Sequence, residues 1–224
     1  QIMPILTPAH HAEFQKNGYV VVRNLITPEQ VAELRADYEK AVRGEIPVPQ
    51  FEGRKKEGAV VQLACPSQHI PGWAEHEYMK RCLAVARELL GENQNYAYDQ
   101  IIFKPPHSGS PTAWHQDAAY WGGDAHEGKE AVTGWLALGP AIPENGCMQF
   151  VPGSHLGPLQ PHYSIAGQSE INEALTTDVD DALAVPCPLE PGDASFHHSL
   201  TLHYTGPNES EIPRFGLITH FMPG

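Results

Sequence analysis

The chain has 224 residues, a length that suits one domain with a sizeable core. It carries 14 Lys and Arg against 27 Asp and Glu, and this formal charge of −13 disfavours phosphate backbones and anionic membrane surfaces as partners. No apolar stretch approaches the ~20 residues of a membrane-spanning helix, and the first residues show no secretory signal pattern. The 4 cysteines have no C-x-x-C spacing, which indicates free thiols. We therefore expect a cytoplasmic monomer or homodimer that binds neither nucleic acid nor membrane.

Helices are expected to dominate residues 1–91. Residues 7–18 open with Thr-Pro and close with glycine, a typical helical segment. Residues 27–44 begin with a threonine N-cap, a proline and a glutamine in capping-box spacing, and apolar residues then recur at helical spacing. Residues 19–23 form a short β-branched run between them, and residues 75–90 predict a third amphipathic helix.

After Gly91 the pattern changes to short β-branched and aromatic runs separated by Gly and Pro turns. About eight strands at this spacing indicate a sandwich or barrel. The predicted strands are Tyr96–Phe103, Trp114–Tyr120, Val132–Leu138, Cys147–Val151, Leu183–Pro186, Ala194–Phe196, Leu200–Thr205 and Phe215–Phe221. We expect a mainly β fold with N-terminal helices: a cupin-like jelly roll, or double-stranded β-helix, over residues 92–224, with the helices packed on one sheet and a single domain spanning residues 1–224.

The segment Trp114-His115-Gln116-Asp117 carries the strongest chemical signal. In a strand, side chains two residues apart point to the same face, so His115 and Asp117 can offer an imidazole nitrogen and a carboxylate oxygen to one metal ion. An isolated H-x-D is common, and the site needs a third ligand from a distant strand.

Four downstream histidines are candidates for this third ligand: His197, His198, His203 and His220. His203 is favoured because Thr205 follows on the same face, a Gly-Pro-Asn turn comes next, and Arg214 follows 11 residues after His203. A hairpin of that length can bring Arg214 back beside the ligand. Two histidines and one carboxylate leave open positions on a metal, as in non-haem Fe(II) oxygenases, and an arginine nearby suits a co-substrate carboxylate.

Further motifs accompany this constellation along more than half of the chain. They are Lys104-Pro105-Pro106, Glu144-Asn145-Gly146-Cys147-Met148, Pro152-Gly153-Ser154-His155 and Pro191-Gly192-Asp193. Together with the H-x-D segment and the His203…Arg214 pair, they resemble the phytanoyl-CoA dioxygenase family. The resemblance implies an Fe(II)/2-oxoglutarate dioxygenase that uses O₂ and hydroxylates an unactivated C–H bond of a small molecule, releasing succinate and CO₂.

The resemblance also implies roles for individual residues. Iron would be bound by His115, Asp117 and His203. The 2-oxoglutarate pocket would be formed by Arg214, which pairs with the far carboxylate, by Thr205, which hydrogen-bonds the same carboxylate, and by Trp135 and Gln100. Some relatives that halogenate their substrates lack the motif carboxylate, so the presence of Asp117 disfavours halogenation.

The substrate side of the site is predicted from residues that flank these motifs. Phe103, Tyr120 and Trp121 are expected to form an aromatic wall, and Asn145 and His198 are expected at the mouth. We interpret His197 as a neighbour of the metal ligands, and His220 as a residue that faces the core or the pocket.

Charge narrows the choice of substrate. Arg54-Lys55-Lys56 is the one compact cationic run, so a chain of charge −13 is poorly suited to a polyanionic CoA thioester, and we expect a small free metabolite instead. Lys104 is interpreted as an ordinary strand-end charge, and His155 as a stabiliser of the turn that precedes it.

Two other functions fit the same scaffold. One is a non-redox metal-dependent enzyme of the cupin type, an isomerase or a hydrolase; Arg214 argues against it, because such a site needs no anchor for a dicarboxylate. The other is a binding module that has lost turnover, which the intact ligand set disfavours.

Overall fold

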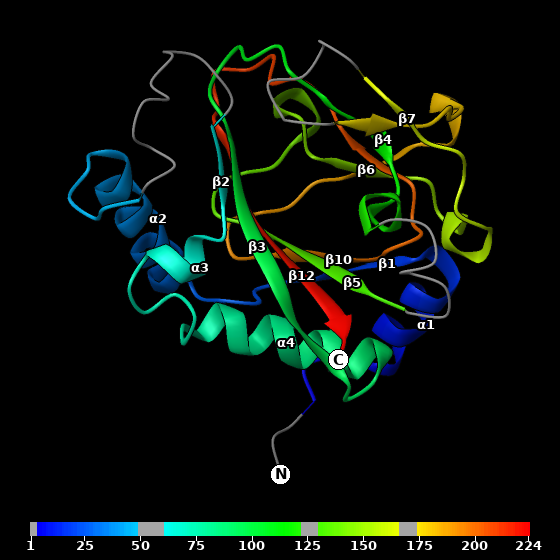
Figure 1. Ribbon diagram of the computed structural model, residues 1–224, viewed down its shortest axis with the longest axis horizontal. Helices are drawn as coiled ribbons and strands as arrows, with labels where there is room; N and C mark the ends of the chain where they lie inside the picture. Colours follow the sequence, from blue (N-terminus) through cyan, green and yellow to red (C-terminus); the bar gives the residue numbers. More distant parts are fainter. Residues whose placement is uncertain (1–3, 49–60, 122–129, 166–173) are drawn as a thin grey trace.

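The computed structural model describes residues 4–48, 61–121, 130–165 and 174–224. Two antiparallel sheets lie face to face, as Figure 1 shows, and form the expected jelly roll. The larger sheet has the strand order β1 (Tyr19–Val22), β10 (Ala194–His198), β5 (Val132–Ala137), β12 (Arg214–Pro223), β3 (Gln94–Lys104), β2 (Val61–Ala64). The smaller sheet has the order β4 (Thr112–His115), β11 (His203–Thr205), β6 (Met148–Phe150), β9 (Val185–Cys187), and a separate pair is formed by β7 (Tyr163–Ser164) and β8 (Leu175–Thr176).

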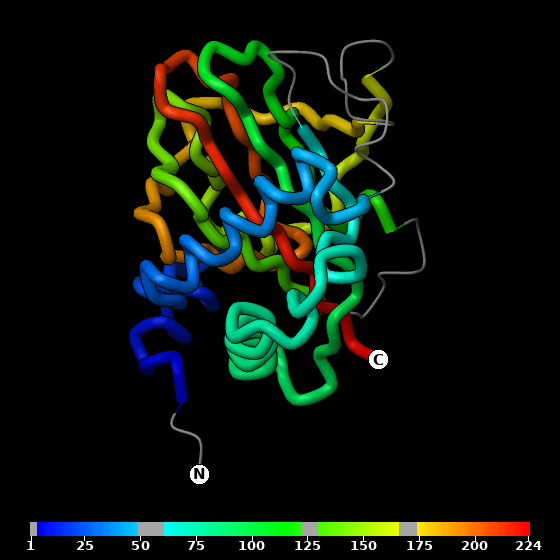
Figure 2. The backbone as a smooth tube through the Cα atoms, turned by 90° about the vertical axis from the view of Figure 1, so that its left-hand side faces the viewer, coloured from blue at the N-terminus to red at the C-terminus, as the bar shows by residue number. Residues whose placement is uncertain are grey.

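The helices lie on the outer face of the larger sheet, as the sequence predicted (Figures 1 and 2). They are α1 (Pro8–Asn17), α2 (Pro28–Val42), α3 (Pro66–His69) and α4 (Glu77–Leu90). The predicted capping box of α2 is present: the Thr27 side chain accepts from the Gln30 backbone, and the Gln30 side chain accepts from the Thr27 backbone. Tyr38 of α2 packs on Phe103 and Phe215 of the sheet, so this face forms the main apolar core.

Two predictions about strands are wrong. The predicted strand over Trp114–Tyr120 ends at His115, and the short 3-10 helix η2 (Asp117–Trp121) follows it. The predicted hairpin between His203 and Arg214 is also absent, because β11 belongs to the smaller sheet and β12 to the larger one. The connection therefore crosses from one sheet to the other.

The inner faces of the two sheets enclose a second, smaller apolar cluster. Alternation along the strands points Ile102, Trp135 and Ile218 inward, and Tyr19 stacks on Phe150 across the sandwich. This inner space also receives the polar residues described below, which makes it the place for a site.

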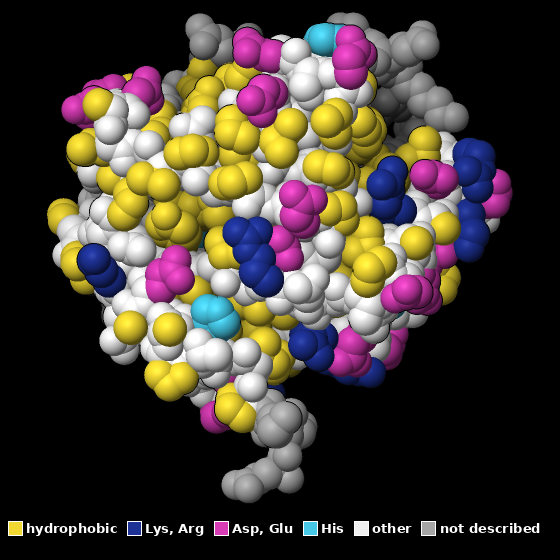
Figure 3. All heavy atoms as spheres, turned by 180° about the vertical axis from the view of Figure 1, so that it is seen from behind, with side chains coloured by type: hydrophobic (Ala, Val, Ile, Leu, Met, Phe, Trp, Pro, Cys, Tyr) yellow, Lys and Arg dark blue, Asp and Glu magenta, His cyan; other side chains and the backbone are white. Residues whose placement is uncertain are grey.

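The four cysteines are free thiols, as predicted, and Cys82, Cys147 and Cys187 are buried. Over the described ranges, no helix has the length and apolar character needed to cross a membrane. On the face shown in Figure 3, Lys and Arg side chains lie beside acidic ones.

Candidate functional site

The structure brings together the three residues selected as metal ligands. His115 at the end of β4 and His203 at the start of β11 are partners across the two strands, and their ring centres are 4.1 Å apart. Asp117 begins η2, which turns its carboxylate back toward them: Oδ1 lies 3.5 Å from His115 Nε2 and 3.4 Å from His203 Nε2. All three side chains are buried. The three side chains lie together as predicted. However, His115 and Asp117 do not share a strand face, because the strand ends at His115 and the turn of η2 brings Asp117 back.

The hydrogen bonds of the two imidazoles favour metal binding. His115 Nδ1 lies 2.7 Å from the Ala113 carbonyl oxygen, and His203 Nδ1 lies 2.9 Å from that of Thr201. Because a carbonyl only accepts, each Nδ1 carries the hydrogen and each Nε2 presents a lone pair. Burial lowers the pKa of His115, which keeps its ring neutral. Neighbouring ligands on a metal with bonds of ~2.1 Å lie ~3 Å apart, close to the separations seen here.

The two oxygens of Asp117 have different partners. Oδ2 accepts hydrogen bonds from Thr133 Oγ1 at 2.6 Å and from His197 Nε2 at 3.1 Å, whereas Oδ1 faces His115 and His203. Burial alone would raise the pKa of Asp117, but the neighbouring imidazoles outweigh it and hold the pKa well below its usual range. The carboxylate is therefore anionic, and Oδ1 is available to a cation. Sequence reasoning missed Thr133, although it lies two residues before Trp135 on the same strand face.

Arg214 lies at the other end of the inner space, at the start of β12. It is 1% exposed, its Nη1 donates to the Gly146 carbonyl oxygen at 2.7 Å, and its Nε has no partner. The guanidinium carbon lies 5.3 Å from the Trp135 ring centre. Burial lowers the pKa of Arg214 to about 10, so the group is charged at neutral pH, yet no ion pair within the described residues includes it. A buried, unpaired guanidinium suits an incoming carboxylate.

A cavity between the sheets is lined by Arg214 and by two of the candidate metal ligands, Asp117 and His203. The other predicted pocket residues line it as well, namely Gln100, Trp135 and Thr205. Gln100 Nε2 lies 3.3 Å from His220 Nε2, and His220 Nδ1 lies 2.9 Å from Thr133 Oγ1. His220 thus faces the pocket, which is one of the two positions predicted for it.

Lys104 is a polar residue of the site that the sequence interpretation missed. It is 1% exposed, and Nζ donates to Thr205 Oγ1 at 2.9 Å and to the Gly206 carbonyl oxygen at 2.6 Å. Burial, and then the charge of Arg214, lower the pKa of Lys104 to about 6. The interpretation as a strand-end surface charge is therefore wrong. Strand alternation gave the signal, because Lys104 lies four residues after Gln100 on the same face of β3.

The expected aromatic wall is only partly present. Tyr120 is 45% exposed and packs edge-to-face on His115, with ring centres 5.4 Å apart. Trp121 Nε1 donates to the Tyr98 hydroxyl at 3.3 Å, and its ring lies near His220. Phe103 does not belong to this wall. Side chains alternate along β3, and Phe103 follows the inward Ile102, so its ring points to the helix-covered face of the sheet.

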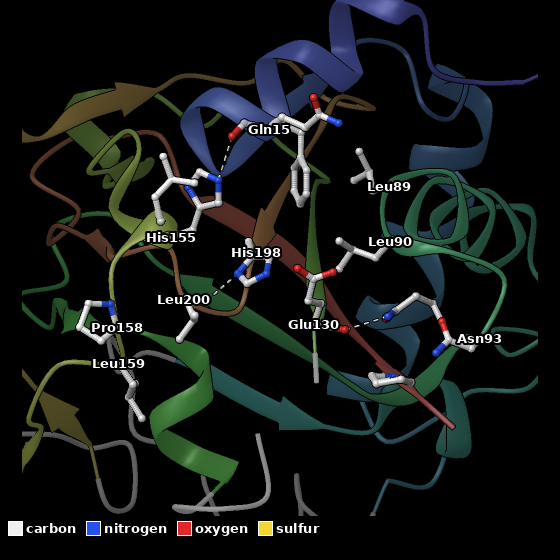
Figure 4. Close-up of a pocket in the computed structure, with 14 residues that line it drawn as sticks. Gln15, Leu89, Leu90, Asn93, Glu130, His155, Pro158, Leu159, His198 and Leu200 are labelled. Atoms are coloured by element: carbon white, nitrogen blue, oxygen red, sulfur yellow. Dashed lines mark hydrogen bonds between the residues drawn. The ribbon is translucent and has the colours of Figure 1, made fainter. Parts of the chain in front are cut away.

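Neither Asn145 nor His198 lies at the mouth of this cavity. Asn145 is fully buried and holds a turn, accepting from the Ile142 backbone and donating to the Pro140 carbonyl oxygen. His198 follows His197 in β10 and so points to the opposite face of the strand, where it lines a separate cavity of about 860 Å³ (Figure 4). His155 lines the same cavity and ties its turn to α1 through the Gln15 carbonyl oxygen. The cationic run Arg54–Lys56 lies outside the described residues.

Comparison with known proteins also indicates a 2-oxoglutarate-dependent dioxygenase. The profile of the phytanoyl-CoA dioxygenase (PhyH) family matches residues 14–216. The peroxisomal phytanoyl-CoA dioxygenase of Rattus norvegicus is 27% identical over 224 residues, which cover 93% of this chain and 66% of the rat enzyme. A probable alpha-ketoglutarate-dependent hypophosphite dioxygenase of Stutzerimonas stutzeri is 29% identical over 218 residues, which cover 90% of this chain and 73% of that protein.

Solved structures with the same fold include complexes with the co-substrate. EvdO2 from Micromonospora carbonacea var. aurantiaca, complexed with 2-oxoglutarate, has a TM-score of 0.83 and 29% identity, and the match covers 98% of this chain and 91% of EvdO2. The epimerase SnoN, in complex with Fe3+, alpha ketoglutarate and nogalamycin RO, has a TM-score of 0.71 and 27% identity, and the match covers 96% of this chain and 82% of SnoN.

Proposed function

This chain belongs to the phytanoyl-CoA dioxygenase family of 2-oxoglutarate-dependent oxygenases, and from that premise we propose that it hydroxylates an unactivated C–H bond of a small-molecule metabolite. Enzymes of this class use Fe(II), 2-oxoglutarate and O₂. In the overall balance, R–H, 2-oxoglutarate and O₂ give R–OH, succinate and CO₂. The proposal rests on one observation above all: Asp117 and His203, two members of the cluster that includes His115, line the same cavity as the buried guanidinium of Arg214.

We assign the iron to His115 Nε2, Asp117 Oδ1 and His203 Nε2. Two neutral imidazoles and one carboxylate are the donor set preferred by non-haem iron oxygenases, and three protein ligands leave neighbouring positions open. Bound there, Fe(II) would supply the activation of O₂ coupled to oxidation of the 2-oxo acid. The protein's own contribution is to fix the ligands: backbone carbonyls hold both Nδ1 atoms, and Thr133 and His197 hold Asp117 Oδ2.

We assign the far carboxylate of 2-oxoglutarate to Arg214. A charged hydrogen bond gains strength in a site closed to water, and the free Nε of Arg214 is a donor that this carboxylate would satisfy. Thr205 offers a hydroxyl from the neighbouring wall, Trp135 packs against the guanidinium, and Gln100 lines the same cavity. These residues would orient the 2-oxo acid with its reactive end toward the metal ligands.

We place the substrate near Tyr120 and Trp121, because Tyr120 packs on His115 and is itself 45% exposed. The aromatic rings favour an apolar or ring-bearing portion of the substrate. A formal charge of −13 supports a small free metabolite over a CoA thioester. Submicromolar or micromolar affinity for an acyl-CoA in a direct binding assay would contradict this choice.

An oxygen-free titration tests the assignment of the iron and the co-substrate. Fe(II)-loaded protein should develop a weak visible charge-transfer band when 2-oxoglutarate is added, because the 2-oxo acid chelates the metal. His115→Ala should lose the band through loss of iron, whereas Arg214→Met should keep iron and require ~100-fold more 2-oxoglutarate. Absence of the band in the wild-type protein would favour a non-redox isomerase or hydrolase.

Product analysis separates the remaining outcomes. A metabolite screen scored by succinate release should identify a substrate, and isotopically labelled O₂ should place one labelled oxygen atom in its product. Succinate release without labelled product would point to another oxidative outcome, such as epimerisation. A charge-transfer band without succinate release under any condition would indicate a binding module.

A further inference from the structure

Two basic side chains lie side by side at the arginine end of the cavity. Lys104 of β3 and Arg214 of β12 are direct partners across the two strands, and each is 1% exposed. Like charges opposite each other in a sheet are destabilising, and a buried charge without an anion is costly. No acidic side chain within the described residues forms an ion pair with either one. Both groups can therefore be charged together only when an anion joins them, which indicates a function in anion binding.

Lys104 reaches the cavity through Thr205. Thr205 lines the cavity and Lys104 does not, and Lys104 Nζ donates to Thr205 Oγ1 at 2.9 Å from behind. The Gly206 carbonyl oxygen, 2.6 Å away, accepts from the same Nζ and fixes the direction of the amino group. Because Thr205 Oγ1 accepts from Lys104, its own hydrogen is available for donation, and the described part of the chain offers it no acceptor.

From this geometry we infer that Lys104 is a positioning residue for 2-oxoglutarate. By donating to Thr205 Oγ1, it turns the Thr205 O–H toward the far carboxylate. Once protonated in the complex, it joins Arg214 in selecting a dicarboxylate over a 2-oxo acid with one carboxylate. This inference rests on the proposed function and deepens it, because it names a second determinant of co-substrate choice.

The electrostatics of the pair support this role. Burial and Arg214 lower the pKa of Lys104 to about 6, so an arriving carboxylate would raise it again. Two other titratable groups lie in this region. The buried guanidinium of Arg214 has a pKa of about 10, and burial raises the pKa of the neighbouring Cys147 thiol to about 11. Neither changes its charge near neutral pH. Binding of 2-oxoglutarate at pH 7 to 8 should therefore be accompanied by proton uptake at Lys104.

The test compares two ligands on Lys104→Met. Oxygen-free protein loaded with Mn(II) is titrated with 2-oxoglutarate and with 2-oxopentanoate, which has the same chain length and a methyl group in place of the far carboxylate. We expect affinity for 2-oxoglutarate to fall ~10- to 100-fold and affinity for 2-oxopentanoate to change less than about twofold. The exposed Lys40→Met, on α2, is the matched control and should bind both ligands as the wild type does.

Two further measurements separate positioning from a structural role. If Lys104 acts through Thr205, the losses in Lys104→Met and Thr205→Val should be less than additive in the double variant. Calorimetry in buffers of different ionisation enthalpy should detect proton uptake in the wild type and none in Lys104→Met. Equal weakening of both ligands, or wild-type discrimination in Lys104→Met, would overturn the inference. Failure of the wild type to bind 2-oxoglutarate would instead refute the proposed function.

Discussion

Hydrogen bonds fix the orientation of Asp117, the carboxylate proposed to bind the metal. Its Oδ2 is held by Thr133 and His197, which leaves Oδ1 to face the two imidazoles. The hydrogen bonds continue in one direction: Gln100 Nε2 donates to His220 Nε2, His220 Nδ1 to Thr133 Oγ1, and Thr133 to Asp117. Each hydrogen in this series has one acceptor, so the orientation of the carboxylate is set by residues on β3, β12 and β5.

Thr133→Val tests this orientation. Valine keeps the shape of threonine but removes the 2.6 Å hydrogen bond to Asp117 Oδ2, so we expect affinity for Fe(II) to fall ~10- to 100-fold. Equilibrium competition with a metal chelator measures the change. Thr27→Val is the matched control, because the Thr27 hydroxyl accepts from the Gln30 backbone at the start of α2, outside the sandwich, and its loss should leave iron affinity unchanged. Equal iron affinities in wild type and Thr133→Val would show that Asp117 needs no such support.

At the scale of elements, the close approach of β12 to β5 holds the arginine end of the cavity. Gly216 and Trp135 meet across these strands, and a Cβ on residue 216 would overlap the Trp135 indole. Glycine at this position lets the indole lie flat against the strand, where it faces the Arg214 guanidinium. The absence of a side chain at residue 216 therefore sets the position of Trp135 beside Arg214.

Gly216→Ala should displace the Trp135 indole. We expect the free energy of unfolding to fall by ~1–3 kcal/mol, as overpacking typically costs, together with weaker binding of 2-oxoglutarate. Urea denaturation and ligand titration measure the two effects. Gly109→Ala meets nothing within 4 Å and serves as the control, with an expected change of less than ~1 kcal/mol. Comparable losses in both variants would mean that the tight contact at residue 216 is not the cause.

Local patterns predicted most helices and strands. Strand alternation, applied to every strand, would also have predicted which side chains point into the cavity. The capping box of α2 and the β-branched runs locate helices and strands because they act through neighbours in sequence. Alternation along β3 separates the inward Gln100 and Lys104 from the outward Phe103, yet Phe103 was expected in the pocket and Lys104 on the surface. The same rule assigns His197 and His198 to opposite faces of β10.

At the scale of the whole molecule, the site depends on the pairing of two sheets, which local pattern does not encode. His115 and His203 come from the smaller sheet, while Arg214, Trp135 and Thr133 come from the larger one. The spacing of His203 and Arg214 suggested a hairpin, but the chain crosses between the sheets instead, so the two residues come to one cavity by a different route from the predicted one. Only the resemblance of several motifs to a known family carried this non-local information.

Three buried histidines link the stability of the whole fold to pH. Burial lowers the pKa of His197, His198 and His220 to about 4, whereas in the unfolded chain each should titrate near ~6.5. Between these values the unfolded chain binds protons that the folded protein does not, so acid favours unfolding. The free energy of unfolding should decrease as pH falls from ~6.5 to ~4, by up to ~1.4 kcal/mol per pH unit for each histidine, and these groups should add no further loss below ~4.

His198→Gln tests this linkage away from the proposed metal ligands, because His198 lines the second cavity and its Nδ1 accepts from the Leu200 backbone. Urea unfolding of chelator-treated protein at several pH values gives the slope of stability against pH. Removing one of the three groups should make the slope between pH ~6.5 and ~4 shallower, while stability at pH 8 reports the separate cost of the lost ring. An unchanged slope in His198→Gln would mean that the acid sensitivity arises elsewhere in the fold, with the carboxylates as the next candidates.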